Sequence, residues 1–447
     1  MHSELLSPLF SSQAMQAALA DDRRIAAMLA FEAALARAEA SVGLVPEDAA
    51  AAIGQACATF SADIAALAAA TRQAGNPAIP FVKALTAHCP EPGRGWVHWG
   101  ATSQDAIDTA SAIVGRDAVA LIDADIVRLG DALAARAETH RATGMPGRTL
   151  LQPALPVTLG FKIAGWLDMA TRSRLALHRA RDEALTLQFG GAVGTLAAVG
   201  PAAEAVRAAL GRDLGLPVPA VTSHTARDRI VRLGSELAIL TGALAKIAGD
   251  IALMMQAEIG EVSEPAAPGR GGSSTLPQKR NPVAAPVVRS AAIRAGGLVA
   301  GLVAAMQQEN ERGAGGWHSE WTLLPDLFDV AAGALGHMVE TADGLEVRPQ
   351  RMRDNLAIGA GTLMSESLMM ALAPQTGRQI AHHLVQDAAK RAIADGRTLG
   401  DVACDTPDIA DALGRDGIAR ALDPASYLGT SEATVDAAVS AWRSAGG

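Results

Sequence analysis

Aromatic residues and cysteines are scarce in this sequence. Phe, Trp and Tyr together make up 3% of 447 residues, whereas hydrophobic residues as a whole make up 49%. A chain rich in Ala and Leu favours close helix packing over a β-sandwich, whose core needs bulky and β-branched side chains. The three cysteines, Cys57, Cys89 and Cys404, lie far apart without a CxxC pair, which indicates neither a zinc site nor a disulfide framework. We therefore expect an all-α protein in a reducing compartment.

Long basic runs and a targeting segment are also missing. The formal net charge is −9, which argues against nucleic acid or an anionic membrane as a partner. The first residues, MHSELLSPLFSS, lack a basic region followed by an apolar core, and charges interrupt the later apolar stretches. These features predict a soluble cytoplasmic protein with no membrane partner.

Three stretches show the spacing of a helical bundle. Apolar residues step by three and four from Ile230 to Met254, which predicts a helix over about 227–260. The pattern recurs from Val119 to Leu133, and a third long helix is expected over 283–308, after Asn281 and Pro282. Seams this regular commonly continue across subunits, so we expect a homo-oligomer.

Breaks in this pattern divide the chain. The segments GNPAIP, CPEPGRGW and GLEVRP interrupt the helical periodicity. We predict an N-terminal helical domain over 1–110, a central long-helix bundle over 111–345 and a C-terminal helical domain over 346–447.

A connection between two of the long helices is far longer than geometry requires. Residues 264–282, named the signature loop here, end in GGSSTLPQKRNP, whereas about two to eight residues would suffice. Its glycines let backbone N–H groups turn toward a ligand, and the next helix is expected to offer its positive end to an anion. Lys279 and Arg280 add positive charge. The alternative is a disordered, solvated loop, and the order of residues does not match a nucleotide-binding G-x-x-x-x-G-K-[ST] loop.

A second polar cluster, VHWGATSQD, occupies residues 97–105. A capping box explains its Thr and Asp but not His98. The adjacent His382 and His383 point in two directions on a helix and make a poor metal site. The glycines of 189–200 lack the G-x-G-x-x-G order, so they indicate a helix break that borders a pocket and not a dinucleotide site. We expect neither a metal nor a cofactor.

These motifs carry a family resemblance. GSSTLPQKRNP resembles the G-S-S-x-M-P-x-K-x-N-P signature of the fumarase/aspartase superfamily, with Leu276 in place of Met. The segments VHWGATSQD, GRTLLQPALP and GGAVGT resemble the other superfamily blocks in the same order. The resemblance implies three helical domains around a central bundle, a homotetramer with active sites shared between three subunits, and no cofactor.

Other segments narrow the resemblance. HWGATSQD, ENERGAGGWHSEW, SESLMMALAPQTGRQIAHHLV and DPASYLG are similar to bacterial cycloisomerases of this superfamily, which form a lactone from a muconate tricarboxylate. The resemblance makes Ser273 the proton donor, with Lys279 and Asn281 stabilising developing negative charge. Further candidates for binding the small polycarboxylate are His98, Thr102, Ser103, Gln152, Ser274 and Arg280, and other cations near the motifs are Arg148 and Arg289.

One position departs from the superfamily pattern. Many members read T-H-x-Q where this chain has Thr149-Leu150-Leu151-Gln152, so Leu150 replaces a histidine that serves the leaving group. An amine or hydroxide leaving group needs that proton, whereas a carboxylate leaving from a lactone, with a pKa of about 4, does not. Leu150 thus favours a cycloisomerase over an adenylosuccinate- or argininosuccinate-type lyase. His140 is a candidate for a substitute catalytic role, and a non-catalytic scaffold is the remaining alternative.

Overall fold

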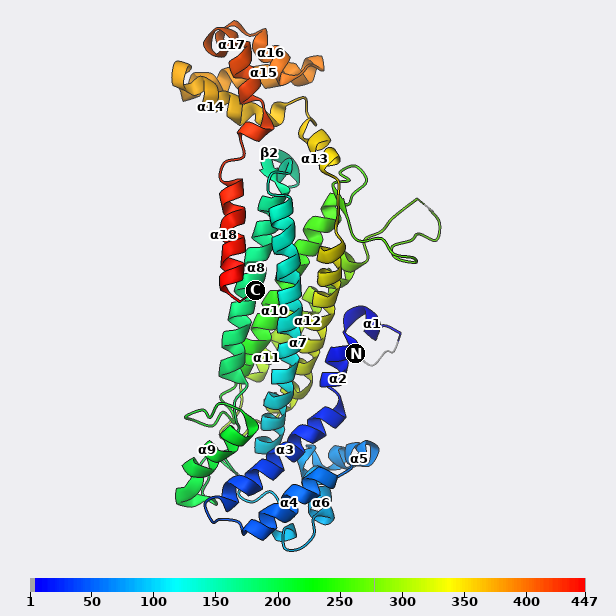
Figure 1. Cartoon of the computed structure of the whole chain (residues 1–447), viewed down its shortest axis with the longest axis vertical. Helices are drawn as coiled ribbons and strands as arrows, with labels where there is room; N and C mark the ends of the chain where they lie inside the picture. Colours follow the sequence, from blue (N-terminus) through cyan, green and yellow to red (C-terminus); the bar gives the residue numbers. More distant parts are fainter. Residues whose placement is uncertain (1–4, 277, 447) are drawn as a thin grey trace. The chain divides into compact units, whose positions relative to one another are not determined.

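Helices dominate this computed structural model, which describes residues 5–276 and 278–446 (Figure 1). The five long helices are α7 (Ser103–Thr139), α8 (Leu159–Ala184), α10 (Asp228–Met254), α11 (Ala284–Ala305) and α12 (Gly316–Gly344). They are preceded by α1 (Ser7–Phe10), α2 (Gln13–Ala18), α3 (Asp21–Ala40), α4 (Glu47–Thr59), α5 (Ile64–Ala74), α6 (Ala78–His88) and the 3-10 helix η1 (Arg94–Trp96). The all-α prediction is confirmed, although α10 ends earlier than the predicted residue 260.

Shorter elements connect and follow the long helices. Between them lie β1 (Gly144–Thr149), β2 (Gln152–Thr158), η2 (Gly200–Ala202), α9 (Ala203–Leu214) and β3 (Val262–Ser263). After α12 come β4 (Glu346–Val347), α13 (Pro349–Leu356), η3 (Thr362–Met364), α14 (Ser365–Thr376), α15 (Arg378–Asp395), α16 (Leu399–Cys404), α17 (Pro407–Ala421), η4 (Pro424–Ser426) and α18 (Ser431–Ser444). The antiparallel pairs β1–β2 and β3–β4 were not expected from the sequence.

The chain divides into two compact units, each made of three segments. The first combines Met1–Ile126, Ser173–Ala245 and Val287–His337, and the second combines Val127–Arg172, Lys246–Pro286 and Met338–Gly447. The predicted domain boundaries at 110 and 345 stay a prediction. The first lies inside α7, and the second directly follows α12.

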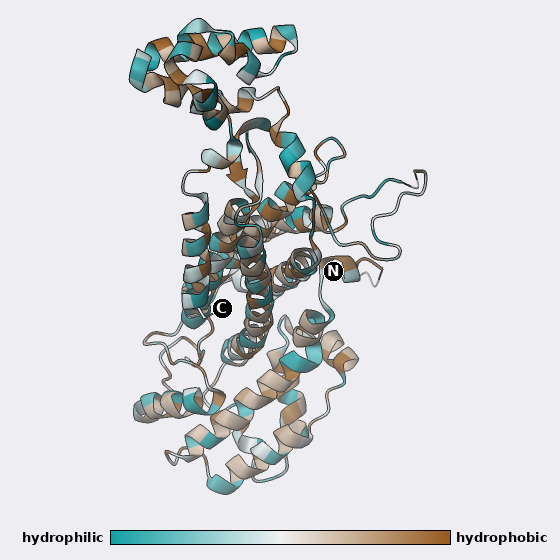
Figure 2. Cartoon of the chain, turned by 45° about the horizontal axis from the view of Figure 1, so that its top comes forward, coloured by the Kyte–Doolittle hydropathy of each residue, from teal (hydrophilic) through white to brown (hydrophobic). Residues whose placement is uncertain are grey.

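The core of the first unit joins its N-terminal helices to the start of α7. Residues of α3, α4 and α6, among them Met28, Ile53 and Phe81, pack with Ile107 of α7 and Trp317 of α12. Further along the unit, the long helices approach closely at Gly234, where a Cβ atom would lie 2.5 Å from Leu302 Cδ1. Figure 2 shows hydrophobic and hydrophilic residues interspersed along the helices.

The second unit has its own core and a close helix contact. The helices α14 to α17 pack on one another (Figure 1), around buried residues such as Leu368, Val385 and Ile409. In α7, Gly130 leaves room for Trp442 of α18, because a Cβ atom there would lie 2.2 Å from the indole ring. Trp442 Nε1 also donates to Asp131 Oδ1 over 2.8 Å.

Two of the long helices, α10 and α11, are long and apolar enough to cross a membrane by length and composition. The bent pair α4 and α5 passes the same test when counted as one span. Less than half of the most apolar stretch of α10 or α11 is buried within the chain. These helices therefore leave apolar surface for a further partner, and the expectation of no membrane partner stays a prediction.

Candidate active site

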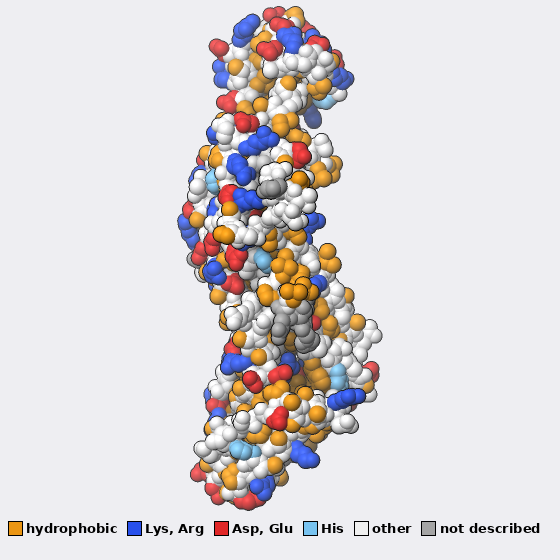
Figure 3. All heavy atoms as spheres, turned by 90° about the vertical axis from the view of Figure 1, so that its right-hand side faces the viewer, with side chains coloured by type: hydrophobic (Ala, Val, Ile, Leu, Met, Phe, Trp, Pro, Cys, Tyr) orange, Lys and Arg blue, Asp and Glu red, His pale blue; other side chains and the backbone are white. Residues whose placement is uncertain are grey.

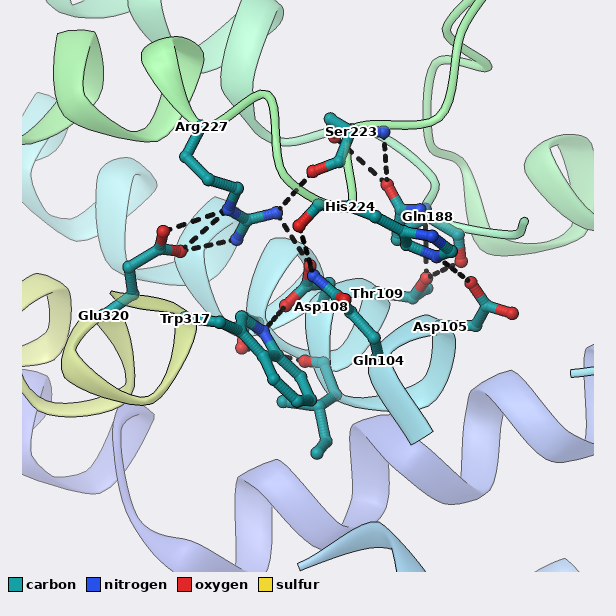
Figure 4. Close-up of polar contacts among 12 residues, drawn as sticks. Gln104, Asp105, Asp108, Thr109, Gln188, Ser223, His224, Arg227, Trp317 and Glu320 are labelled. Carbon is teal, nitrogen blue, oxygen red and sulfur yellow. Dashed lines mark hydrogen bonds and ion pairs between the residues drawn. The ribbon is translucent and has the colours of Figure 1, made fainter. Parts of the chain in front are cut away.

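The turn at residues 98–105 is fixed by the buried carboxylate of Asp105. Its Oδ2 accepts from the N–H of Thr102 over 3.0 Å, which is the backbone half of the predicted capping box. The same carboxylate accepts from the N–H groups of Gly190 and Gly191 over 2.9 and 2.8 Å. His224 Nε2 lies 3.2 Å from its Oδ1 (Figure 4). Asp105 thus ties the glycine-rich segment to the start of α7.

The hydroxyl of Thr102 makes a hydrogen bond that a capping box does not predict. Thr102 Oγ1 accepts from Arg312 Nη1 over 2.9 Å, and Arg312 Nη2 donates to the carbonyl of Ala192 over 3.0 Å. Ser103 is the first residue of α7. The sequence did not single out Arg312, although it lies in the quoted segment ENERGAGGWHSEW. Its guanidinium joins three of the family blocks within the first unit.

The imidazole of His98 contacts a buried carboxylate. Its Nδ1 lies 2.6 Å from Glu32 Oε1 of α3, and 15% of its side chain is exposed. Burial alone lowers the pKa of the imidazole, but the charge and the hydrogen bond of Glu32 outweigh it, so the pKa is raised above 6.5. The backbone of His98 has a φ of 62°, in the left-handed region that is uncommon for residues other than glycine.

A buried ion network lies next to this turn (Figure 4). Arg227, at the start of α10, donates to both carboxylate oxygens of Glu320 over 3.0 Å and to Asp108 Oδ2 over 2.8 Å. Trp317 Nε1 donates to the other oxygen of Asp108 over 2.8 Å. Against the effect of burial, the two carboxylates hold the pKa of Arg227 above its ordinary value. The sequence does not reveal this network, because an Arg at the start of an apolar seam gives no sign of its distant partners.

The signature loop, described except for residue 277, presents Ser273 with two backbone donors. The N–H groups of Thr275 and Leu276 donate to Ser273 Oγ over 3.3 and 3.1 Å. Ser274 and Lys279 are exposed. Asn281 is half-buried and its N–H donates to the carbonyl of Gly271 over 2.8 Å, which closes the base of the loop.

The N–H groups at the N-terminus of the next helix, α11, already have an acceptor within the protein. Glu264, at the start of the loop, accepts from the N–H groups of Val283, Ala284 and Ala285 over 2.8, 3.0 and 3.0 Å. These donors at the beginning of α11 are the ones that we expected to meet a bound anion, so that expectation is wrong. The donors left for a ligand are therefore those of the loop's own residues 271–276 and 278–281.

Arg280 has two partners within the protein. Both terminal nitrogens of its guanidinium donate to the carboxylate of Glu346 over 2.8 Å, and it also donates to the carbonyl of Glu264. The hydrogen bond to Glu346 raises the pKa of Arg280 further. In this structure Arg280 thus anchors the loop, and its predicted contact with substrate stays a prediction.

The hairpin β1–β2 carries Leu150 and Leu151 at its tip. Both have a positive φ, 49° and 67°, and their relative exposures are 96% and 71%. Gln152 is exposed directly beside them. Behind the tip, Arg148 forms a two-pronged ion pair with the buried Glu261, over 2.9 and 2.7 Å. Arg148 is therefore held by a carboxylate of its own unit.

His140 lies where α7 turns into the hairpin. Its Nδ1 is 3.2 Å from Thr143 Oγ1, and its carbonyl accepts from the N–H groups of Thr143 and Gly160. Burial, with the charge of Arg136, lowers the pKa of the imidazole, so that it is neutral at pH 7. These contacts show that His140 stabilises the turn between α7 and the hairpin. Its catalytic role stays a prediction.

The candidate residues fall into two sets. The first unit carries His98, Thr102 and Ser103, and the second carries His140, Gln152, Ser273, Ser274, Lys279, Arg280 and Asn281. In the described part of the chain, no group of three or more His, Cys, Asp or Glu residues is placed to hold a metal ion.

Comparisons with known proteins place the chain in a family. The family described as "Lyase" matches residues 7–297, and the one described as "Adenylosuccinate lyase C-terminus" matches residues 361–438. The chain belongs to this lyase family. The fumarase/aspartase-like fold is confirmed as well, because the crystal structure of 3-carboxy-cis,cis-muconate lactonizing enzyme from Pseudomonas putida matches with a TM-score of 0.94 at 46% identity, covering 100% of both chains.

Two curated relatives show how function varies within this lyase family. The 3-carboxy-cis,cis-muconate cycloisomerase of Pseudomonas aeruginosa is 48% identical over 98% of this chain and 96% of its own. Nitrosuccinate lyase of Streptomyces davaonensis is 42% identical over 98% of this chain and 94% of its own.

Proposed function

We propose that this chain is a cycloisomerase that interconverts 3-carboxy-cis,cis-muconate and 4-carboxymuconolactone, in the protocatechuate (β-ketoadipate) route. The observation that carries the proposal is the near-full-length similarity to a relative of that name, at 48% identity over 98% of the chain. The presence of Leu150 at the hairpin tip supports it, since a carboxylate leaving group needs no acid there. We further propose a cytoplasmic enzyme that needs no cofactor.

The chemistry makes two demands on the site. One substrate carboxylate adds to a carbon–carbon double bond of the same molecule, and the conjugated carboxylate becomes an enediolate-like dianion until the adjacent carbon is protonated. Preorganised donors must stabilise the added negative charge, and a positioned acid must deliver the proton. We assign the donor role to Lys279, Asn281 and N–H groups of the signature loop.

Ser273 fits the role of the acid, and of the base in the reverse direction. A serine hydroxyl is by itself a poor base, so its alkoxide must be stabilised by its surroundings. The two N–H groups that donate to Ser273 Oγ favour the charged oxygen over the neutral one. Lys279 of the same loop adds a positive charge.

We assign the remaining contacts to the substrate carboxylates. His98, Thr102 and Ser103 come from the first unit, whereas Gln152, Ser274 and Arg280 come from the second. A homotetramer with active sites shared between three subunits would combine such sets from different copies of the chain. In this assembly the two sets need not meet within one chain.

The first test is activity and its dependence on Ser273. Purified protein without added metal or nucleotide should consume 3-carboxy-cis,cis-muconate, seen as loss of the ultraviolet absorbance of the conjugated diene. Ser273→Ala should reduce kcat by at least about 100-fold, because general acid catalysis contributes that much or more. Ser290→Ala, a half-buried serine inside α11, is the matched control and should keep the parent rate.

Two results would change the assignment. Equal rates for the parent and Ser273→Ala would show that another group moves the proton. Cleavage of adenylosuccinate, argininosuccinate or nitrosuccinate in place of the muconate reaction would make the protein a lyase, despite Leu150. Inactivity toward all of these substrates would favour a non-catalytic scaffold.

A further inference from the structure

Two carboxyl groups of α3 lie buried beneath the turn that carries His98. Glu32 and Glu39 have relative exposures of 1% and 0%. Glu32 uses Oε1 to hold His98 Nδ1, while its Oε2 and both oxygens of Glu39 have no hydrogen-bond partner among the described residues. A Cβ atom on Gly100 would lie 3.7 Å from Glu39 Oε1, so this carboxyl group sits directly under the turn.

The contact with Glu32 determines which ring nitrogen of His98 is available. A nitrogen 2.6 Å from a carboxylate oxygen carries a proton and donates it, so Nδ1 is occupied. For Nε2, the described part of the protein supplies no hydrogen-bond acceptor. Nε2 is therefore available to a ligand. When the imidazole is charged, Nε2 also carries a proton and can donate it.

The charges around the imidazole favour its cationic form. Glu32 of α3 and Asp105 of α7 both act on His98, and burial acts in the opposite direction. Glu39 stays protonated at pH 7, because burial and the neighbouring Glu32 raise its pKa to about 8. On α4, the thiol of Cys57 is neutral, because burial and Glu32 raise its pKa to about 12.

We propose that Glu32 is a positioning residue, which holds His98 as a cation with its Nε2–H directed to a carboxylate of the substrate. The inference deepens the proposed function and rests on it, since a tricarboxylate requires fixed positive charge. The backbone of His98 is left-handed, a strained conformation of the kind that persists only where its surroundings hold it. Glu32 itself is buried beneath the turn and acts through His98.

Chemical modification of His98 tests the charge directly. Diethyl pyrocarbonate reacts with neutral imidazole, and peptide mass spectrometry gives its rate at each histidine. In the parent, we expect half-maximal modification of His98 above pH 6.5, its ordinary pKa. In Glu32→Gln, the loss of the buried charge should shift that midpoint down by at least about one unit, so modification at pH 7 becomes faster. His382, exposed on α15, is the internal standard.

Kinetics separate positioning from a general structural defect. Between the modification midpoints of the variant and the parent, Glu32→Gln should raise the KM for 3-carboxy-cis,cis-muconate with little change in kcat, because there the variant has lost the charge that the parent keeps. His98→Gln should have the same effect, and the double variant should be no worse than either single one. Glu183→Gln removes a carboxylate from an exposed position of α8 and should match the parent in both assays.

Each outcome decides a separate point. A parent midpoint at or below pH 6.5, or an unchanged midpoint in Glu32→Gln, would overturn the proposal. If Glu32→Gln does not fold, the parent midpoint still decides, and Glu32→Asp should retain part of the shift. A shifted midpoint in a protein that does not convert 3-carboxy-cis,cis-muconate would leave the Glu32–His98 coupling in place and remove only the substrate assignment.

Discussion

At the scale of single residues, Glu39 of the first unit is an ionisable group in an unusual environment. It is fully buried, and its carboxyl oxygens lack hydrogen-bond partners in the described ranges 5–276 and 278–446. An ionised carboxylate in such a place costs several kcal/mol, so the group keeps its proton instead. Its pKa of about 8 in the folded protein lies well above the ordinary 4.5.

This shift predicts a pH dependence of stability with a definite sign. Below pH 4.5 both the folded and the unfolded chain hold the proton, so Glu39 has no effect. As the pH rises from 4.5 to about 8, the unfolded chain loses the proton and the folded chain keeps it, so the free energy of unfolding falls. Above that range the decrease in the free energy of unfolding is complete. It amounts to a few kcal/mol, at about 1.4 kcal/mol for each unit by which the two pKa values differ.

Glu39→Gln isolates this contribution. The side chain of the variant cannot ionise at this position. The free energy of unfolding of the variant minus that of the parent should therefore rise steadily from pH 5 to pH 8. Urea denaturation at several pH values and one protein concentration measures the difference. Burying the amide adds an offset that is the same at every pH. A difference between variant and parent that stays flat across this range would mean that Glu39 is ionised in the folded protein.

At the scale of elements, Glu264 joins the two ends of the signature loop. It starts the loop and accepts the three N–H groups that begin α11. Glu264→Ala would leave these donors without their acceptor at a largely buried helix end, and it would remove a favourable charge from the helix dipole. We expect a loss of about 2 to 4 kcal/mol in the free energy of unfolding.

Glu346→Ala is the matched control for Glu264→Ala. It removes the carboxylate that pairs with Arg280, but that pair is partly exposed, and such pairs contribute about 1 kcal/mol or less. Urea denaturation should thus separate the two variants. Hydrogen exchange adds a local readout, since amides 283–285 should lose protection only in Glu264→Ala, while those of 272–276 should exchange fast even in the parent without ligand. Equal stability losses would contradict the capping role.

The elements also show what the sequence could and could not reveal. The apolar seam from Ile230 to Met254 predicted α10, because burial along one face imposes the spacing of three and four. The hairpin β1–β2 was missed, since Pro146, Pro153 and a bulge disturb strand alternation. Its turn is formed by two leucines with positive φ, where the usual signal is Asn-Gly or Asp-Gly.

The candidate site was only partly predictable for a related reason. Motif order located His98, Thr102 and Ser273, because the family pattern is local in sequence. The supports of these residues, Glu32 and Arg312, are distant in sequence and become visible only in three dimensions. The capping of α11 by Glu264 likewise could not be inferred, since the two ends of a long loop give no sign of meeting.

At the scale of the whole molecule, the long helices expose apolar side chains that one chain does not cover. Ile239 of α10 and Ile293 of α11 have relative exposures of 56% and 79%. Figure 3 shows hydrophobic side chains gathered in patches on one face of the chain. Continuous apolar patches on a protein surface commonly mark an interface. The proposed homotetramer would cover these helices with copies of themselves.

The assembly can be tested by placing a charge on these helices. Light scattering should give the parent a mass four times that of the 45.7 kDa chain. Ile293→Glu and Ile239→Glu should each shift the protein to smaller species, because a carboxylate buried in an apolar interface costs several kcal/mol. Ile393→Glu, at a position 69% exposed on α15, should leave the tetramer intact.

The same variants link assembly to catalysis. If active sites combine residues of different copies, the smaller species should lose activity with 3-carboxy-cis,cis-muconate, although Ser273, Lys279 and His98 are unchanged. Activity should return as protein concentration rises and the tetramer re-forms. A dissociated variant with full activity per chain would show instead that one chain holds a complete site. The two sets of candidate residues would then have to meet within each chain.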